Sequence, residues 1–330
     1  MPAQPPLLAT VWRGQVPEAA IRGHVAVVDA AGAVVGAVGD PGTTITLRSC
    51  VKPLQALPFV RGAAQRIGAG SAELAVACAS HQGEDTHVAA VRHLLQLAGV
   101  DEEALGCGPQ LPFDEQAAQR LLASGGRPQR IHNNCSGKHA AMLATCAVAG
   151  WPLAGYMDAA HPCQHAVTAA MGTLLGQDLR KAPWGVDGCG LPTYGVPLAS
   201  LAQAFAAGQA DPGFRACQDA MTAHPHLVAG TGRFDTALLA EAGGGLTAKI
   251  GGAAVWVAVL RPDGPAVALK LEAGTGEAVA PVAIAVLERI GAFPDGVPEA
   301  LAEFRQPRLR NWEGAAVGET RVEAGGLASL

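Results

Sequence analysis

A serine and a lysine three positions apart give the first sign of chemistry in this chain. Ser49 and Lys52 lie in the segment 47–58, LRSCVKPLQALP. If the segment turns helical after Thr46, residues i and i+3 share a face, and the Lys52 amine can reach the Ser49 hydroxyl. A serine becomes nucleophilic when a neighbouring base takes its proton, and a lysine can be that base if burial or a nearby cation, here Arg48, lowers its pKa. An exposed Ser and Lys at a helix start is the alternative.

A second serine follows an apolar run. Residues 74–79, LAVACA, lead directly into Ser80 and His81. A buried helix or strand that ends here would present these two polar side chains to a cleft. A capping serine with a surface histidine is the alternative interpretation.

A third polar cluster lies at the predicted start of a helix. Residues 131–145, IHNNCSGKHAAMLAT, combine N-cap residue types, among them Asn134, with an apolar run from Ala140. The backbone N–H groups at such a helix start suit an anionic or carbonyl ligand. Cys135 and His139, at i and i+4, could share one face as metal ligands.

The Gly-rich segment 184–193, WGVDGCGLPT, adds the Asp187 carboxylate and the Cys189 thiol. Two cysteines with one nitrogen donor would form an open zinc site, since a structural zinc site has four protein ligands. Two buried cysteines without a metal are the alternative, because free cysteine is among the most buried residue types.

Composition narrows the class of protein. The chain has 330 residues, of which 49% are hydrophobic and 15% charged, with a net charge of −5. This composition predicts a sizeable core and argues against nucleic acid as a partner. The N-terminal residues lack a signal-peptide pattern, no apolar run is long enough to span a membrane, and the eight cysteines are scattered. We therefore expect a cytoplasmic protein.

Strand and helix patterns alternate in a definite order. Val-rich runs around the turn Asp29–Gly32 predict a hairpin over 24–37, with a short strand over 43–47. Helical periodicity covers 53–67, 85–98, 198–222 and 278–291. Strands are predicted at 246–252, 255–260 and 266–271, with a last one near 317–321. We expect an α/β (α+β) fold with a mainly antiparallel sheet packed with helices. Residues 1–330 would form a single catalytic unit, its sheet built from about 8–47 and 245–322 around a helical middle of about 53–225.

The motifs together resemble the L-asparaginase II family of the rhizobial, inducible type, over roughly residues 8 to 322. The resemblance is carried by Arg48-Ser49-x-x-Lys52-Pro53, Cys78-Ala-Ser80-His81, Asn134-Cys135-Ser136-Gly137-Lys138-His139, Asp187-Gly188-Cys189-x-Leu191-Pro192, His224-Pro225, Val228-Ala-Gly230-x-Gly232-Arg233 and Lys249-x-Gly251. It implies a fold similar to serine β-lactamases, penicillin-binding proteins and serine glutaminases, a homodimer, and hydrolysis of L-asparagine to L-aspartate and ammonia.

The resemblance also implies roles for individual residues. Ser49 would be the nucleophile with Lys52 as its partner, and Ser80 and Lys249 would form a second Ser–Lys pair. Substrate contacts are expected from Arg48, Asn134, His139 and Asp187. One zinc ion per chain, held by Cys135, Lys138 and Cys189, would assist substrate binding. A lysine ligand must be neutral, so the metal itself would have to lower the pKa of Lys138.

The sequence departs from the family at two places and leaves rivals open. Asp235 stands where the family has a cysteine, and residues 271–274 read LEAG where many relatives have an acidic-Gly sequence. The choice between asparagine and glutamine is therefore open. A β-lactamase or DD-peptidase is the rival enzyme, although the chain lacks a Ser-Asp-Asn triplet and Lys249-Ile250-Gly251 matches K-T-G imperfectly. An inactive protein that binds zinc or an amino acid is the rival from another class.

Overall fold

The computed structural model describes residues 4–330, which divide into two compact units. The sheet unit comprises the residues up to Cys50, Gly195–Ala207 and Glu241–Leu330. The helical unit comprises Val51–Tyr194 and Gly208–Ala240. Three separate stretches of sequence therefore build the sheet unit, and the N-terminal and C-terminal stretches supply its strands.

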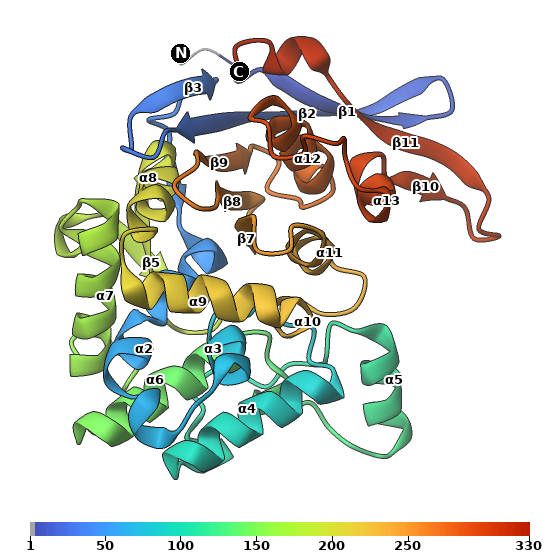
Figure 1. Ribbon diagram of the computed structural model, residues 1–330. Coiled ribbons are helices and arrows are strands. Elements are labelled where there is room, and N and C mark those ends of the chain that lie inside the picture. The colour runs from blue at the N-terminus through green and yellow to red at the C-terminus, as the bar shows by residue number, and fades with distance from the viewer. Residues whose placement is uncertain (1–3) are drawn as a thin grey trace. The chain divides into compact units, whose positions relative to one another are not determined.

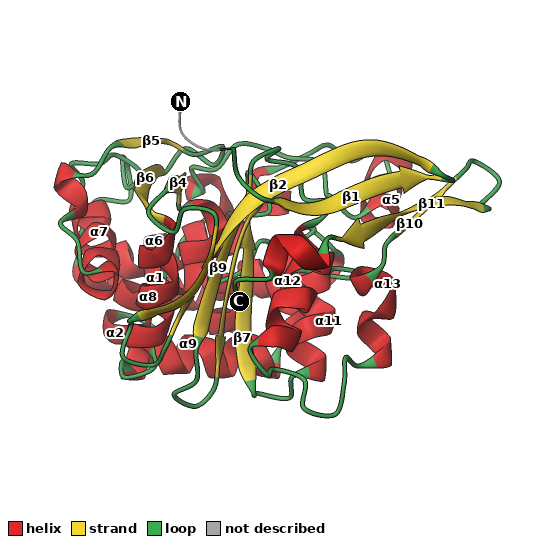
Figure 2. Cartoon of the chain, turned by 90° about the horizontal axis from the view of Figure 1, so that it is seen from above, coloured by secondary structure: helices red, strands yellow, loops and turns green. Residues whose placement is uncertain are grey.

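An antiparallel sheet of eight strands is the framework of the sheet unit (Figure 1). Its order is β10-β11-β1-β2-β9-β8-β7, and β3 also pairs with β2. The strands are β1 (Leu7–Arg13), β2 (Val16–Val28), β3 (Val34–Val38), β7 (Leu246–Gly251), β8 (Val255–Leu260), β9 (Ala266–Leu271), β10 (Arg308–Arg310) and β11 (Ala316–Val322). Figure 2 shows β1, β2, β10 and β11 as a curved ribbon.

The core of the sheet unit lies at strands β7, β8 and β9. These strands are rich in Val, Leu and Ala, and β8 is buried from Val255 to Val259. β-Branched residues suit a pleated surface, and full burial of one such side chain stabilises the fold by about 1.5–3 kcal/mol. Helix α12 (Val279–Arg289) packs on β8, β9 and β11 and buries its Val, Ile and Leu residues there. The other helices of this unit are α8 (Leu198–Gly208) and α13 (Ala302–Arg305).

The helical unit is built around α6 (Ser136–Ala149), which is buried from Ser136 to Cys146. This helix contacts α2, α3 and α4 (Figure 1). Its small, apolar residues favour close helix packing, since they leave neighbouring backbones free to approach. The helices of this unit are α1 (Lys52–Gln55), α2 (Leu57–Gly62), α3 (Ser71–Ala77), α4 (Asp85–Ala98), α5 (Glu115–Ala123), α6, α7 (Pro162–Leu175), α9 (Pro212–Ala223), α10 (Pro225–Val228) and α11 (Phe234–Glu241).

Three further strands form a small sheet in the order β4-β6-β5. β4 (Thr44–Thr46) pairs with the second half of β6 (Pro192–Pro197), and β5 (Trp184–Val186) pairs with its first half. No helix within residues 4–330 has both the length and the apolar character that a membrane crossing requires.

The predicted fold class is confirmed, and so are the strands at 246–271 and the helices near 85–98 and 279–289. The helical segment predicted over 198–222 consists of two helices, α8 and α9, with a break between them. Asp211 caps α9 by accepting a hydrogen bond from the Phe214 N–H, and Pro212 occupies its first turn. Both residues favour a helix start, which explains the break.

Candidate functional site

Ser49 lies in a short 3₁₀ turn, Arg48–Val51, directly against strand β7 of the sheet unit. A methyl group on Gly251 would come 2.9 Å from Cys50 Sγ and 3.3 Å from Ser49 N. The Cys50 thiol also donates a hydrogen bond to the Lys249 carbonyl over 3.3 Å. Glycine is therefore required at position 251, because any side chain would push the strand away from Ser49.

Lys249 and Arg48 complete the part of the site that the sheet unit carries. The Lys249 side chain is fully buried, and its amine donates a hydrogen bond to the Ile250 carbonyl over 2.9 Å. Arg48 has a left-handed backbone with φ of 47°. A methyl group on Gly252 would lie 2.8 Å from the Arg48 guanidinium, so the turn that follows β7 lies against this side chain.

Lys52 opens helix α1 in the helical unit and is fully buried. Its amine donates hydrogen bonds to the Ser80 hydroxyl over 2.9 Å, to the Asn134 carbonyl over 3.4 Å and to the Ala79 carbonyl. Ser80 follows α3, and its N–H is fixed by the Val228 carbonyl at 2.9 Å. The contact between Lys52 and Ser80 was not predicted, because 28 residues separate the two positions.

Two thiols and an amine form a buried cluster at the start of α6. The Lys138 amine donates a hydrogen bond to Cys189 Sγ over 3.2 Å, and the two thiols of Cys135 and Cys189 are hydrogen-bonded to each other. The hydrogen bond from Cys189, helped by the charges of Lys52 and Lys138, lowers the pKa of Cys135 well below its usual value. Donation to Cys135, together with burial, raises the pKa of Cys189. The hydrogen bond between the two thiols thus favours ionisation at Cys135.

Lys138 is held as an ammonium by this cluster. Burial alone would lower the pKa of Lys138, but the charges of Cys135, Cys189 and Asp187 outweigh burial and raise it. The donor set of two thiols and one amine suits an open zinc site, provided that zinc displaces the proton of the amine and the remaining thiol proton. Lys138, and not His139, is the nitrogen donor in contact with Cys189.

His139 faces a different partner. Its Nδ1 lies 2.6 Å from the Tyr156 hydroxyl, which accepts a hydrogen bond from the Gly106 N–H over 2.7 Å. If the Tyr156 hydroxyl donates its proton to Nδ1, the ring proton of His139 lies on Nε2. Nε2 is buried and has no hydrogen-bond partner within residues 4–330. Burial and the charges of Lys138 and Lys52 lower the pKa of His139 well below its usual value, so the ring stays neutral.

The loop that carries Ser80 is fixed by residues that the sequence did not single out. The Glu84 carboxylate accepts hydrogen bonds from the Thr231 N–H over 2.8 Å and from the Thr231 hydroxyl over 2.9 Å. A methyl group on Gly230 would lie 2.5 Å from this carboxylate. The segment 224–233 thereby holds the loop 80–85, whereas the sequence had suggested only a substrate-side scaffold or a dimer contact for it.

Glu84, His87 and His226 have the residue types of a metal site, and their ligand atoms lie within 4.8 Å of one another. Both ring nitrogens of His87 already have partners, since Nδ1 accepts from the Glu84 N–H and Nε2 donates to the His226 carbonyl. The two imidazoles are stacked with centroids 5.1 Å apart and an interplanar angle of 17°. Their in-plane lone pairs therefore run parallel and do not converge on one ion. We assign this cluster to packing.

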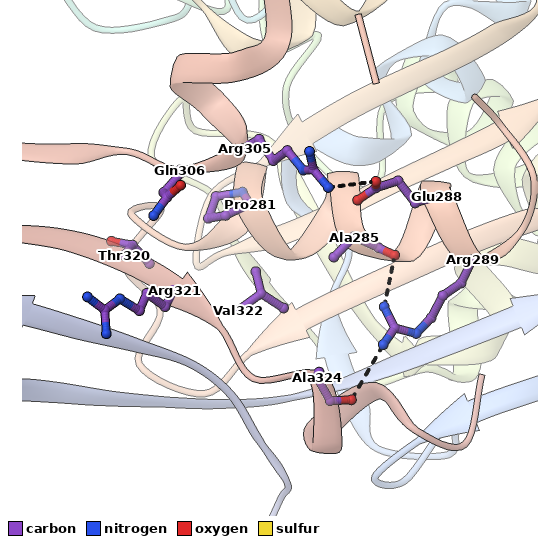
Figure 3. Close-up of a pocket in the computed structure, with 10 residues that line it drawn as sticks. All are labelled: Pro281, Ala285, Glu288, Arg289, Arg305, Gln306, Thr320, Arg321, Val322 and Ala324. Carbon is purple, nitrogen blue, oxygen red and sulfur yellow. Dashed lines mark hydrogen bonds and ion pairs between the residues drawn. The ribbon is translucent and has the colours of Figure 1, made fainter. Parts of the chain in front are cut away.

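A separate pocket of about 370 Å³ lies in the sheet unit between α12 and β11 (Figure 3). Its charged walls are satisfied locally, since Arg305 pairs with Glu288 over 2.9 Å and Arg289 donates to the carbonyls of Ala285 and Ala324. The predicted site residues all lie outside its lining.

The predicted site residues therefore divide between the two units. Arg48, Ser49 and Lys249 belong to the sheet unit, and the residues of the Lys52 and thiol clusters belong to the helical unit. The latter are Lys52, Ser80, Asn134, Cys135, Lys138, His139, Asp187 and Cys189. The chain passes from one unit to the other between Cys50 and Val51. Ser49 and Lys52, which only these two residues separate, therefore belong to different units.

A serine hydroxyl that is hydrogen-bonded to a buried lysine amine can exchange a proton with it. A family model described as L-asparaginase II matches residues 9–322. The chain belongs to the L-asparaginase II family, and it is an enzyme of the amidohydrolase type.

The other comparisons are more distant. A crystal structure described as a β-lactamase from Mycobacterium bovis is 18% identical, with a TM-score of 0.41, and the match covers 81% of this chain and 94% of that chain. The comparison with curated proteins gives no significant match.

Proposed function

We propose that the protein hydrolyses L-asparagine to L-aspartate and ammonia. The family match over residues 9–322 supports an amidohydrolase. The observation that carries the finer proposal is the hydrogen bond of 2.9 Å from the buried Lys52 amine to the Ser80 hydroxyl. This contact joins Lys52 to Ser80, so a proton that Lys52 takes from Ser49 can pass along a hydrogen bond to the Ser80 hydroxyl.

In the proposed reaction, Lys52 first loses one proton, which gives up one of its three donated hydrogen bonds and frees a lone pair. Ser49 Oγ then attacks the side-chain amide carbon of asparagine, and neutral Lys52 takes the hydroxyl proton. Backbone N–H groups at the start of α6, with the Ser80 hydroxyl, stabilise the oxyanion of the tetrahedral intermediate. Lys52 passes this proton to the leaving nitrogen, which departs as ammonia and leaves a β-aspartyl ester on Ser49. Water then hydrolyses this ester and returns the proton to Ser49.

The remaining residues bind the substrate or tune the proton path. Lys249 keeps Ser80 in a hydrogen-bonding state, and the Arg48 guanidinium pairs with the α-carboxylate of asparagine. Asn134, Asp187 and His139 orient the substrate, the last through its Nε2–H, which is buried without a partner in the described chain. A buried donor gains a full hydrogen bond when a ligand reaches it.

We further propose that Cys135, Lys138 and Cys189 hold one zinc ion. The geometry that supports this is the contact of Lys138 with Cys189 at 3.2 Å, next to the Cys135 thiol. Bound zinc would supply a Lewis acid that orients the substrate. A cytoplasmic location, a homodimer and a single catalytic unit for the whole chain stay predictions.

The test is ammonia release from L-asparagine by the wild-type protein and by Ser49→Ala, with L-glutamine as the second substrate. Loss of the nucleophile should lower kcat by at least about 10³-fold. Acid quenching during turnover, followed by peptide mapping, should locate the aspartyl ester on Ser49. An ester on Ser80, or a fully active Ser49→Ala protein, would overturn the assignment of the nucleophile. If neither amide releases ammonia, hydrolysis of nitrocefin tests the β-lactamase-like alternative.

A further inference from the structure

The turn between β7 and β8 has an unusual backbone. Gly251 and Val255 close the hairpin, and within it Ala253 and Ala254 have φ values of 57° and 53°. The left-handed region suits glycine or asparagine, because a Cβ crowds the following carbonyl oxygen. Hairpin turns that need two left-handed residues are usually built from Asn-Gly or Gly-Gly. Two alanines in this conformation require support from their surroundings.

Strand β9 supplies this support through Lys270. The Lys270 amine donates hydrogen bonds to the Ala253 carbonyl over 2.7 Å and to the Leu271 carbonyl over 2.8 Å. The Leu271 N–H in turn donates to the Ala254 carbonyl over 3.0 Å. Lys270 lies opposite Val255 in the β8–β9 register, next to the turn. The carbonyls of both left-handed alanines are therefore held from the same strand.

The turn that Lys270 holds is part of the candidate site. A methyl group added at its first residue, Gly252, would lie 2.8 Å from the Arg48 guanidinium. The preceding Gly251 lies in the same way against Cys50 and the backbone nitrogen of Ser49. The turn thus packs closely on Arg48 and Ser49, and a shift of the turn toward these residues would displace them.

The Lys270 amine is half-buried, and its hydrogen-bond acceptors are the backbone carbonyls of Ala253 and Leu271. Burial lowers the pKa of Lys270, and the nearby charge of Glu272 opposes this effect. The Glu272 carboxylate itself lies 3.1 Å from Nε2 of His24.

We propose that Lys270 is a positioning residue of the active site: it holds the β7–β8 turn in its left-handed conformation and thereby places Ser49 and Arg48. Its effect on turnover rests on the proposed function, because that function makes Ser49 the nucleophile. Its effect on the turn does not.

The first test compares Lys270→Met with Lys270→Arg. Methionine keeps the length of the side chain and removes the donors, whereas arginine keeps donors that can reach the carbonyls. Misplacement of a nucleophile by about 1 Å can lower turnover about 100-fold, so we expect kcat of Lys270→Met to fall between about 10- and 100-fold. Lys270→Arg should recover most of this loss. Lys181→Met, at an exposed lysine of the helical unit, is the control and should leave kcat unchanged.

A second test asks whether the effect passes through the turn. In the Lys270→Met protein, Ala253→Gly and Ala254→Gly should restore kcat to within about threefold of wild type, because glycine adopts left-handed backbone without crowding. Circular dichroism and thermal unfolding establish that each variant is folded at the assay temperature. A loss of kcat that the two glycines do not restore would overturn the proposal.

Amide hydrogen exchange tests the turn without any substrate. Peptides covering 47–52 and 249–256 should exchange faster in Lys270→Met than in wild type or Lys181→Met. Unchanged exchange would overturn the proposal even if turnover fell. If the wild-type protein releases no ammonia, the proposed function fails, and the exchange experiment still decides the role of Lys270.

Discussion

At the scale of single residues, the amine of Lys52 is the most constrained group of the candidate site. It is fully buried and donates to the Ala79 and Asn134 carbonyls as well as to Ser80. The Asn134 carbonyl also accepts a hydrogen bond from the His81 N–H, whereas the Ala79 carbonyl accepts its hydrogen bond from Lys52. The Lys52 amine thus has two roles: it is the proposed proton acceptor, and its hydrogen bonds stabilise the loop that contains Ala79 and Ser80.

Lys52→Met should therefore lower both activity and stability. Ammonia release should fall to background, because the proton acceptor is gone. The Ala79 carbonyl would be left buried without its donor, which costs about 1–3 kcal/mol. Urea unfolding of the variant and the wild type measures this cost. An equally stable but inactive variant would separate the two roles, and an active variant would contradict the role of Lys52 as base.

The thiol cluster leads to a prediction about zinc. Cys135→Ser and Cys189→Ser should each weaken zinc binding at least about tenfold, because each removes one sulfur ligand. Cys217→Ser is a matched control, since this buried thiol of the helical unit donates to the Pro53 carbonyl. Calorimetric titration with zinc and metal analysis of the purified proteins provide the measurement. Equal affinity in all four proteins would contradict the assignment.

Zinc affinity should also depend on pH. The charges around Lys138 raise its pKa, so the amine is protonated until a metal displaces the proton. Binding then releases protons, and the affinity should increase as the pH rises from 6 to 8. Titrations in buffers of different ionisation enthalpy count these protons. No proton release on binding would mean that Lys138 is not a ligand.

At the scale of elements, the loop 80–85 depends on the segment 224–233 that packs on it. Gly230 has φ of 119°, and a methyl group there would meet the Glu84 carboxylate at 2.5 Å. Gly232 has φ of 67°, and a methyl group there would meet nothing within 4 Å. The two glycines thus provide a matched pair on one loop.

Gly232→Ala should cost about 1 kcal/mol of unfolding free energy, because only the backbone preference changes. Gly230→Ala should cost about 3 kcal/mol or more, since it adds a steric clash with the group that fixes the Ser80 loop. Only Gly230→Ala should also reduce turnover. Chemical denaturation and steady-state kinetics on both variants check this, and equal effects would argue against the Glu84 contact as the cause.

Local patterns predicted elements well and contacts poorly. Strand patterns predicted β7, β8 and β9, and helical periodicity over 85–98 predicted α4. The break between α8 and α9 was visible in Asp211-Pro212, a cap followed by a helix-starting proline, but an Ala-rich pattern obscured it. The Lys52–Ser80 hydrogen bond and the Glu84–Thr231 contact join distant parts of the sequence. No periodicity or spacing encodes such pairs.

At the scale of the whole molecule, buried histidines link stability to pH. Burial is the main cause that lowers the pKa values of His81, His87 and His139 below their usual range. Imidazoles in the unfolded chain titrate near pH 6.5, so below this pH the unfolded state binds protons that the folded state does not. The contribution to stability is therefore complete above about pH 7 and is lost as the pH falls.

Each such histidine should decrease the free energy of unfolding by about 1.4 kcal/mol per pH unit below pH 6.5, until the folded group titrates. His87→Gln should reduce the number of protons taken up on unfolding by up to one, and the slope falls in proportion. His165→Gln, at an exposed position of α7, should leave the slope unchanged. Urea unfolding at several pH values between 5 and 8 measures the slope. A slope that His87→Gln leaves unchanged would contradict the assignment.

All eight cysteines are buried and reduced, and this has a consequence for alkylating agents. Six thiols should react with iodoacetamide only when the chain opens, so their modification would report the rate of opening. Cys135 and Cys146 differ, because hydrogen bonds from Cys189 and Cys163 lower their pKa values. Small electrophiles that enter the helical unit should therefore mark these two thiols first, and intact-mass analysis over time would show two fast additions followed by a cooperative group. The number of fast additions would thus count the thiols whose pKa the fold lowers.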